Sequence, residues 1–299
     1  MTTVTVVRGS RWSGYLLILV AAALWGMIGP VSRYALAEGV TPLEVAFWRS
    51  TLAWFLFGGH ALFTGAVHVR RPHMPAVALF GIVCVALFYG AYQGAVEEGG
   101  AALASVLLYT APAWVALLAR ALLGERITPA KVVAIAITLF GVALVAWNDP
   151  GQSGQSRVSA LAISLGLLSG FTYSLYYLFG KTLLRSYATP TLFLYALPVG
   201  ALALYPWITF VDKSATAWAS LVFVAVVSTY LAYLAYYAGL RHLEATRAAV
   251  VATIEPVVAA LLAWFWWDER FGVLGWLGSA AILGSVLLIV FAQRQAQSR

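Results

Sequence analysis

The polar side chains with the clearest periodic spacing form two triplets inside apolar runs. Each triplet occupies positions i, i+3 and i+4, which share one face of a helix. The triplets are Tyr89, Tyr92 and Gln93, and Tyr233, Tyr236 and Tyr237. Phenol rings stack on apolar solutes while their hydroxyls meet polar groups, so both faces suit the walls of a binding cavity.

A competing interpretation places the triplet members nearest the helix ends in the aromatic belts of a membrane surface. It applies to Tyr92, Gln93, Tyr236 and Tyr237, whereas the deeper Tyr89 and Tyr233 favour the cavity. We also take Tyr109 as a candidate substrate contact. Tyr173, Tyr176 and Tyr177 have the same spacing but rank lower, because their counterparts in the repeat described below are Trp25, Ile28 and Gly29.

Glu255 lies about halfway along an apolar run, directly before Pro256. A buried carboxylate in a membrane is costly and is by default a functional candidate. It would bind a substrate ammonium or another cation, or carry a proton if desolvation raises its pKa. The alternative is a neutral acid that is hydrogen-bonded to a neighbouring helix.

Pro112 and Pro256 each interrupt an apolar run, and a proline frees a backbone carbonyl from the helical ladder. Interruptions at matched positions point to a transport site, so both prolines are candidate hinges; simple structural kinks are the alternative. For Arg49, snorkelling to the outer interface beside Glu44 is favoured over substrate contact.

The sequence holds no pattern of a metal cluster, catalytic triad, P-loop or dinucleotide site, so we expect no cofactor, no metal and no enzyme activity. A membrane-embedded lipid enzyme is a remote alternative, because clustered His, Asp and Ser residues are scarce. The net charge of +7 does not indicate nucleic-acid binding, since Lys and Arg are spread between apolar runs.

The composition indicates that these residues lie in a lipid bilayer, because 62% of the chain is hydrophobic and only 10% is charged. Apolar runs of roughly 20 residues match the thickness of a bilayer core. They predict an all-α polytopic protein with ten transmembrane helices. The spans are 14–36, 42–64, 75–95, 101–122, 129–147, 159–180, 189–210, 216–238, 246–267 and 272–292.

The positive-inside rule sets the orientation. With the N-terminus in the cytoplasm, thirteen of the eighteen Lys and Arg residues fall on the cytoplasmic side. This predicts a multi-pass protein of the inner (plasma) membrane with both termini cytoplasmic.

An internal repeat divides the chain into residues 1–150 and 151–299. At an offset of 144, Tyr89 meets Tyr233 and Pro112 meets Pro256; earlier in each half the offset is 148. Each half holds five spans, an odd number, so the second half must be inverted. Inverted repeats give two near-equivalent conformations around a midplane site, as in secondary transporters.

Several short motifs together resemble the EamA-type exporters of the drug/metabolite transporter superfamily. They are Trp25-Gly26 followed by Arg33, Thr-Pro and Phe-Trp-Arg within 41–49, Gly-Glu-Arg at 124–126 and Asp-Glu-Arg at 268–270. The resemblance implies a central cavity lined by spans three, four, eight and nine. Aromatic amino-acid exporters of the YddG type are a candidate subgroup.

The expected function is export of a small solute, an aromatic or hydrophobic amino acid or a related metabolite, by alternating access. The alternatives are a multidrug or cationic-drug exporter of the same fold and a passive facilitator. Protons are the candidate coupling ion and the lipid bilayer is the surrounding partner. The sequence leaves the oligomeric state open.

Overall fold

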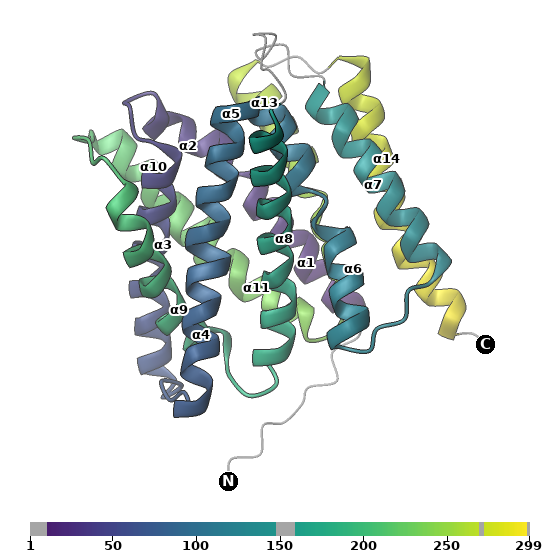
Figure 1. Cartoon of the computed structure of the whole chain (residues 1–299), viewed down its shortest axis with the longest axis horizontal. Coiled ribbons are helices and arrows are strands. Elements are labelled where there is room, and N and C mark those ends of the chain that lie inside the picture. The colour runs from purple at the N-terminus through teal and green to yellow at the C-terminus, as the bar shows by residue number, and fades with distance from the viewer. Residues whose placement is uncertain (1–10, 148–158, 269–271, 298–299) are drawn as a thin grey trace.

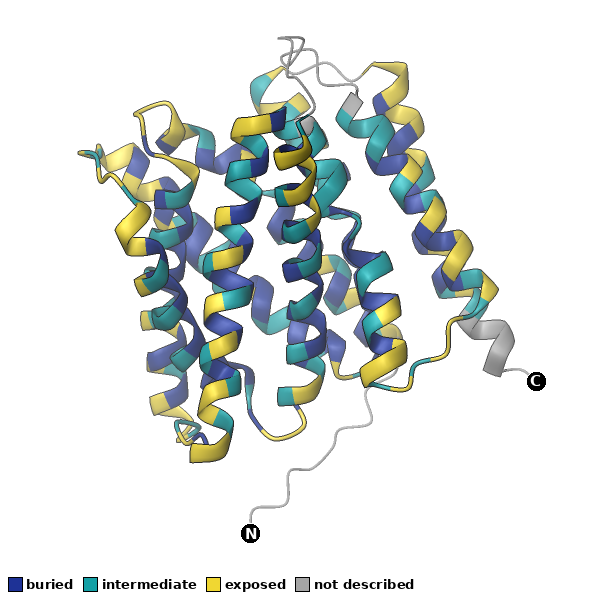
Figure 2. Ribbon diagram, viewed as in Figure 1, coloured by how far each residue is buried: buried dark blue, intermediate teal, exposed yellow. Residues whose placement is uncertain are grey.

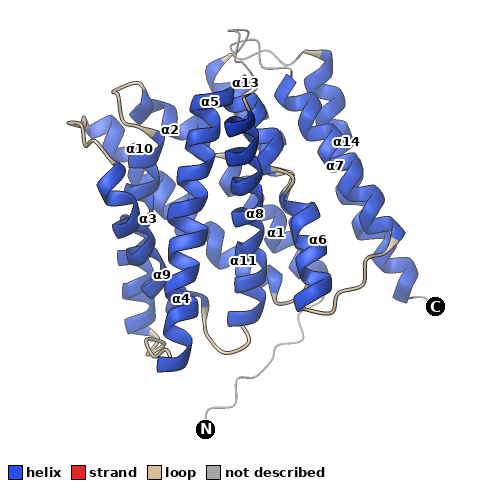
Figure 3. Ribbon diagram, in the orientation of Figure 1, coloured by secondary structure: helices blue, strands red, loops and turns tan. Residues whose placement is uncertain are grey.

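The computed structural model describes residues 11–147, 159–268 and 272–297. Within these ranges all regular elements are helical, as Figure 3 shows. The predicted boundary between the halves, at residues 150 and 151, lies outside the described ranges. The all-α prediction is confirmed.

The first half begins with two short helices that together make one span. Its elements are α1 (Arg11–Gly26), α2 (Ile28–Leu36), α3 (Pro42–Phe63), η1 (Arg71–His73), α4 (Met74–Phe80), η2 (Gly81–Leu87), α5 (Phe88–Leu108), α6 (Ala111–Leu122) and α7 (Pro129–Trp147). Helix α5 contains the boundary between predicted spans 75–95 and 101–122: its backbone leaves helical geometry at Gly100, whose φ of 82° suits glycine.

The second half repeats this order with small differences in length. Its elements are α8 (Ala160–Leu183), α9 (Thr189–Leu204), η4 (Tyr205–Trp207), α10 (Ala215–Ala225), η5 (Val226–Leu231), α11 (Ala232–Leu240), α12 (Ala245–Ala252), α13 (Glu255–Trp267) and α14 (Val273–Gln297). The π-helical segments η2 and η5 lie at equivalent positions, about 144 residues apart.

Nine helical stretches among the described residues are long and apolar enough to cross a membrane. Helix α3 falls outside this set but, at 22 residues, runs beside α9 as a further span. Large apolar side chains face outward, and α14 alternates between them and buried residues that meet α7 (Figure 2). The chain is a polytopic membrane protein, as predicted.

The bundle has two ends, which we name by the chain segments that reach them. The terminal face holds Arg11 at the start of α1 and Gln297 at the end of α14 (Figure 1). The linker face holds the end of α7 at Trp147 and the start of α8 at Ala160. Since the first half starts at one face and the second half starts at the other, the two halves are inverted.

Helix pairs across the halves confirm the inversion. In α7 and α14, the last helix of each half, Thr138 Oγ1 and Ser285 Oγ are 2.8 Å apart and Gly141 packs on Gly278. The numbers rise in one helix while they fall in the other, so the two helices are antiparallel.

Helices α3 and α9 are also equivalent partners, and they are antiparallel for the same reason. Phe57 stacks on Phe193 at 4.8 Å between ring centroids, whereas Phe47 meets Tyr205 at 6.1 Å. Helix α1 also packs against α11, and helix α5 packs against α8. Each of these two pairs joins the first half to the second half. The bundle therefore has an approximate two-fold relation between its repeats.

Candidate functional site

A cavity of about 830 Å³ lies between the two halves. It is lined by residues of both repeats and extends to the linker face, where Leu36, Pro42 and Ala263 contribute. Among the described residues, the loops of the terminal face contribute nothing to its lining. The cavity thus reaches one end of the bundle and is closed at the other.

Eight tyrosines dominate the cavity wall. They are Tyr89, Tyr92, Tyr109, Tyr173, Tyr176, Tyr177, Tyr233 and Tyr236. Tyr176 and Tyr233 stack with ring centroids 5.9 Å apart, and their hydroxyls are 3.3 Å apart. Such a wall offers aromatic faces for stacking and hydroxyls for hydrogen bonds.

The π-helical segments set the direction of the predicted tyrosine faces. Tyr89 follows η2 by two residues and Tyr233 follows η5 by two residues. A π-turn adds one residue to a helical turn and so rotates every side chain after it, a feature that is frequent at functional sites. The periodicity of the sequence predicted that the members of each triplet share one helix face, but it did not predict these π-helical segments.

The structure brings five of the six triplet residues to the cavity, and Tyr237 is the exception. Its ring packs in the core against Gly180 and its hydroxyl donates to the Tyr176 carbonyl at 3.3 Å. The side chains of Tyr236 and Tyr237 are only 2% and 0% exposed, so the belt interpretation is wrong for both.

The tyrosines of α8 contribute more than the sequence suggested. Tyr173, Tyr176 and Tyr177 all line the cavity, and so do their repeat counterparts Trp25, Ile28 and Gly29. Equivalent positions of the two repeats therefore both line the cavity, although their residue types differ. A search for equivalent positions, without a demand for equivalent residues, would have found them.

Glu255 is the first residue of α13 and lies on the cavity wall. Its Oε2 accepts a hydrogen bond from the Tyr173 hydroxyl at 3.4 Å. Tyr109, from the first repeat, lines the same cavity. The carboxyl group is thus hydrogen-bonded to a phenol of α8, on the cavity surface.

Both predicted interruptions occur, one in span four and one in span nine. Between α5 and α6 the helix breaks at Tyr109 and Thr110; between α12 and α13 it breaks at Thr253 and Ile254. These pairs are 144 residues apart, so the two breaks are repeat-related.

Pro112 and Pro256 differ from the prediction in their local role. Each is the second residue of the helix that follows the break, where the missing N–H is one that the helix would leave unpaired. They start new helices and do not kink continuous ones. Their role as hinges stays a prediction.

Glycines let neighbouring helices approach these breaks closely. A Cβ at Gly26 of α1 would lie 2.8 Å from the Glu255 carbonyl oxygen. A Cβ at Gly170 of α8 would lie 2.6 Å from the Leu107 carbonyl oxygen, beside the other break. Such contacts are too short for real side chains, so both helices fit only with glycine.

The snorkelling interpretation of Arg49 is wrong. Its side chain is 5% exposed, lines the cavity, and donates from Nε to Thr229 Oγ1 at 3.0 Å. Glu44 instead forms an ion pair with Lys213 and accepts from Trp48 Nε1 at 3.1 Å. Because Glu44 already has a cationic partner, nothing draws Arg49 outward.

Comparison with known proteins agrees with this architecture. The EamA-like transporter family matches residues 12–147 and 160–291, one copy in each half. The chain belongs to this family. As an EamA-like transporter it is a membrane transporter and not an enzyme. No group of His, Cys, Asp and Glu side chains within the described residues is arranged to hold a metal.

Individual relatives of this EamA-like chain are distant but cover nearly all of its length. An uncharacterized inner membrane transporter of Salmonella typhimurium is 27% identical and covers 96% of this chain and 98% of its own. A probable amino-acid metabolite efflux pump of Escherichia coli is 28% identical, covering 95% and 97%. A solved crystal structure, 20% identical, has a TM-score of 0.83 and covers 96% and 99%, which shows the shared fold.

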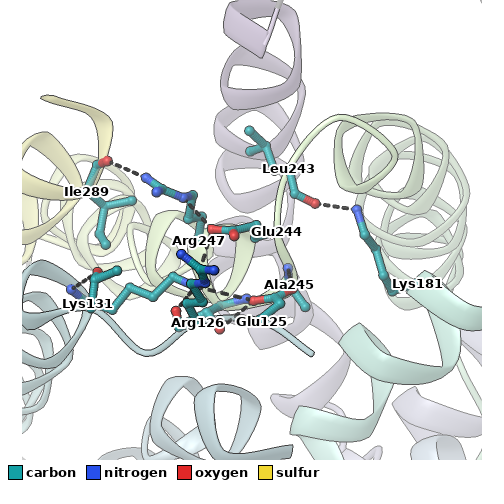
Figure 4. A network of polar contacts seen from close by, with 11 residues as sticks. Glu125, Arg126, Lys131, Lys181, Leu243, Glu244, Ala245, Arg247 and Ile289 are labelled. Carbon is teal, nitrogen blue, oxygen red and sulfur yellow. Dashed lines mark hydrogen bonds and ion pairs between the residues drawn. The ribbon is translucent and has the colours of Figure 1, made fainter. Parts of the chain in front are cut away.

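A polar network occupies the terminal face of this EamA-like fold, where the cavity ends. We call it the terminal-face network; its side chains are Glu125, Lys131, Lys181, Glu244 and Arg247 (Figure 4). The buried Lys131 Nζ lies 3.5 Å from Glu125 and 3.2 Å from Glu244. Two carboxylates from opposite halves thus share one ammonium group.

Glu125 also binds the start of the broken span nine. Its carboxylate accepts from the backbone N–H of Ala245 at 2.6 Å and from the Thr246 hydroxyl at 2.8 Å. These groups open α12, so a side chain of the first half caps a helix of the second half. The network therefore ties the halves together at the closed end of the cavity.

Proposed function

We propose that this EamA-like transporter exports small aromatic or hydrophobic amino acids, or related metabolites, by alternating access through the central cavity. The observation that carries the proposal is the cavity itself: eight tyrosines and the carboxyl group of Glu255 lie together between two inverted repeats. The name of the Escherichia coli relative, an amino-acid metabolite efflux pump, supports the same substrate class.

The cavity chemistry supports a substrate with one ring and one ammonium group. Aromatic rings stack on an apolar side chain, and phenol hydroxyls meet its polar groups. Glu255 would bind the ammonium group or carry a proton in exchange for the substrate. The proposed substrate contacts are Tyr89, Tyr92, Gln93, Tyr109, Tyr233, Tyr236 and Glu255; Tyr237 supports them from the core, and Pro112 and Pro256 act as hinges.

We further propose that the terminal face is cytoplasmic and that the membrane is the inner membrane. Arg70, Arg71, Arg185 and Arg241 all have exposed side chains near that face, in agreement with the positive-inside rule. In this orientation the cavity is in its outward-open state. Opening toward the cytoplasm would then require the terminal-face network to separate.

Transport by the purified protein in proteoliposomes tests the proposal. Radiolabelled phenylalanine, tryptophan, leucine and glycine would be compared, with and without a proton gradient. We expect uptake that prefers the aromatic amino acids and that is stimulated by unlabelled substrate on the opposite side. Transport without preference, or the absence of any amino-acid transport, would contradict the proposal; transport without trans-stimulation would indicate a passive facilitator.

The cavity also fits a second candidate, an exporter of amphipathic cationic drugs. A carboxyl group among phenol rings suits an organic cation, because both the charge and the ring faces attract it. Tetraphenylphosphonium in the same vesicles separates the candidates. Transport of this cation with no transport of phenylalanine would favour the drug exporter, whereas the YddG-type assignment requires the reverse.

A further inference from the structure

Arg49 is a buried cation with unused hydrogen-bonding capacity. It lies in α3, 5% exposed, on the wall of the cavity. Its hydrogen bonds to described residues are limited to that from Nε to Thr229, and no carboxylate in the described chain forms an ion pair with it. Two of its three nitrogens therefore have no partner among the described residues.

The other contacts of Arg49 are electrostatic and leave its remaining nitrogens without a hydrogen bond to a described residue. Its Cζ lies 5.5 Å from the centroid of the Tyr89 ring, a cation–π contact. Glu255 acts on it electrostatically across the cavity but is hydrogen-bonded to Tyr173. A buried guanidinium group with two free nitrogens is expensive unless an anion completes it.

The geometry of the free group selects a carboxylate. The planar guanidinium fork presents two parallel N–H donors, which match the two oxygens of a carboxylate. A doubly charged phosphate would also fit the fork but would face the acid Glu255 in the same cavity. One carboxylate with a nearby ammonium group balances both protein charges.

We propose that Arg49 binds the carboxylate of the transported solute and is a specificity-determining residue of the cavity. This inference rests on the proposed function, since it assigns a role within the same site. Glu255 binds the ammonium group of the solute, Arg49 binds its carboxylate, and the tyrosines contact the side chain of the solute between them. Solutes that lack the carboxylate should therefore bind less tightly.

A purely structural role for Arg49 would act through Thr229. Thr229 lies in the π-helical segment η5, and its hydroxyl also donates to the Val224 carbonyl at 2.9 Å. Thr229 does not line the cavity. The substitution Thr229→Val therefore removes the structural hydrogen bond and leaves the free nitrogens of Arg49 in place, which makes it the matched control.

The test compares three ligands that differ by one group each. Binding of phenylalanine, 2-phenylethylamine, which lacks the carboxylate, and 3-phenylpropionate, which lacks the ammonium group, would be measured on the full-length protein in nanodiscs. For Arg49→Gln we expect a roughly 10- to 100-fold weaker binding of the two carboxylates, the usual value of a charge-assisted hydrogen bond. Binding of 2-phenylethylamine should not weaken, because that ligand makes no contact with this group and no longer shares the cavity with its positive charge.

Each outcome has a distinct meaning. Arg49→Lys, which keeps the charge and loses the fork, should bind the carboxylates with intermediate affinity, and Thr229→Val should keep the wild-type order of ligands. The inference is overturned if Arg49→Gln weakens all three ligands equally, or if Thr229→Val reproduces its pattern. If the wild-type protein binds none of the three, the proposed function has failed before Arg49 is tested.

Discussion

Glu255 is the acidic side chain in the described cavity wall, where it accepts a hydrogen bond from Tyr173. The substitution Glu255→Gln keeps the size and a hydrogen-bond acceptor but removes the charge. We expect efflux driven by a proton gradient to fall by about tenfold or more, since one charged contact is worth at least that factor. The pH dependence of transport should flatten as well. Measured efflux with the wild-type rate and pH profile would remove Glu255 from the mechanism.

Tyrosines of the cavity wall and of the core should respond differently to truncation. Tyr237 is fully buried beside Gly180, so Tyr237→Ala should lower the free energy of unfolding by about 3–5 kcal/mol. Tyr89 borders the cavity, so Tyr89→Ala should mainly weaken binding of an aromatic ligand, by about 1 kcal/mol.

Thermal unfolding and ligand binding of both variants would separate these effects. Tyr237→Phe is the conservative control, since it removes only the hydroxyl that donates to Tyr176. Equal loss of stability in the two alanine variants would contradict the distinction between wall and core.

The terminal-face network lies at the closed end of the cavity, where the broken span nine begins. Glu125 caps α12 and shares Lys131 with Glu244 across the halves. Replacing Glu125 by Ala removes these contacts, and losing a helix cap alone costs about 1 kcal/mol. We therefore expect the conformation open to the terminal face to become several-fold more populated.

A cysteine at Ser105 on the cavity wall, in a Cys84→Ala background, would report this change. Its modification by a reagent added on the terminal side should accelerate in Glu125→Ala. Arg126→Gln is the matched control, because the exposed Arg126 contributes its carbonyl oxygen to Lys131 and that atom remains. Equal labelling rates in Glu125→Ala and wild type would show that the network does not hold this end closed.

The network should also persist in mild acid. Burial by itself raises the pKa of Glu244, but the hydrogen bond from Arg247 and the charge of Lys131 outweigh it and hold that pKa below its ordinary value. The stability that Glu244 contributes is therefore present above the ordinary carboxyl pKa and is lost as the pH falls through the lowered value. The labelling rate of the Ser105→Cys reporter, divided by that of an exposed reference cysteine at Arg185, should be constant between about pH 8 and pH 6, because the ratio cancels the titration of the thiol and a carboxyl with a lowered pKa stays ionised. A change in this ratio across that range would contradict the assignment.

The molecule as an assembly of two inverted halves makes a prediction about topology. Ala37 and Arg185 are both exposed, occupy equivalent positions at an offset of 148, and lie at opposite faces. In cells, an impermeant thiol reagent should label Ala37→Cys and leave Arg185→Cys unlabelled until the membrane is permeabilised, since the terminal face is proposed to be cytoplasmic. Labelling of both cysteines from one side would exclude the inversion.

The sequence by itself determined that the chain lies in a membrane, that its secondary structure is helical and that it contains an internal repeat. Apolar runs as long as a bilayer is thick admit only helices, since lipid offers no partner for an unpaired backbone. An odd number of spans in each half then requires the inversion, which the antiparallel α7 and α14 confirm. The breaks before Pro112 and Pro256 also followed, because proline acts on its own backbone.

Only the tertiary structure decided which polar side chains meet. Periodicity gave the faces of Tyr89 and Tyr233, but it did not show that Arg49 turns inward, where it contacts Thr229, 180 residues away. Tyr237 lies in the core, packed against a glycine of α8. The tyrosines of α8 line the cavity, as do the residues at the equivalent positions of the first repeat, Trp25, Ile28 and Gly29. Such positions follow from the packing of helices that are distant in sequence, and no local pattern encodes that packing.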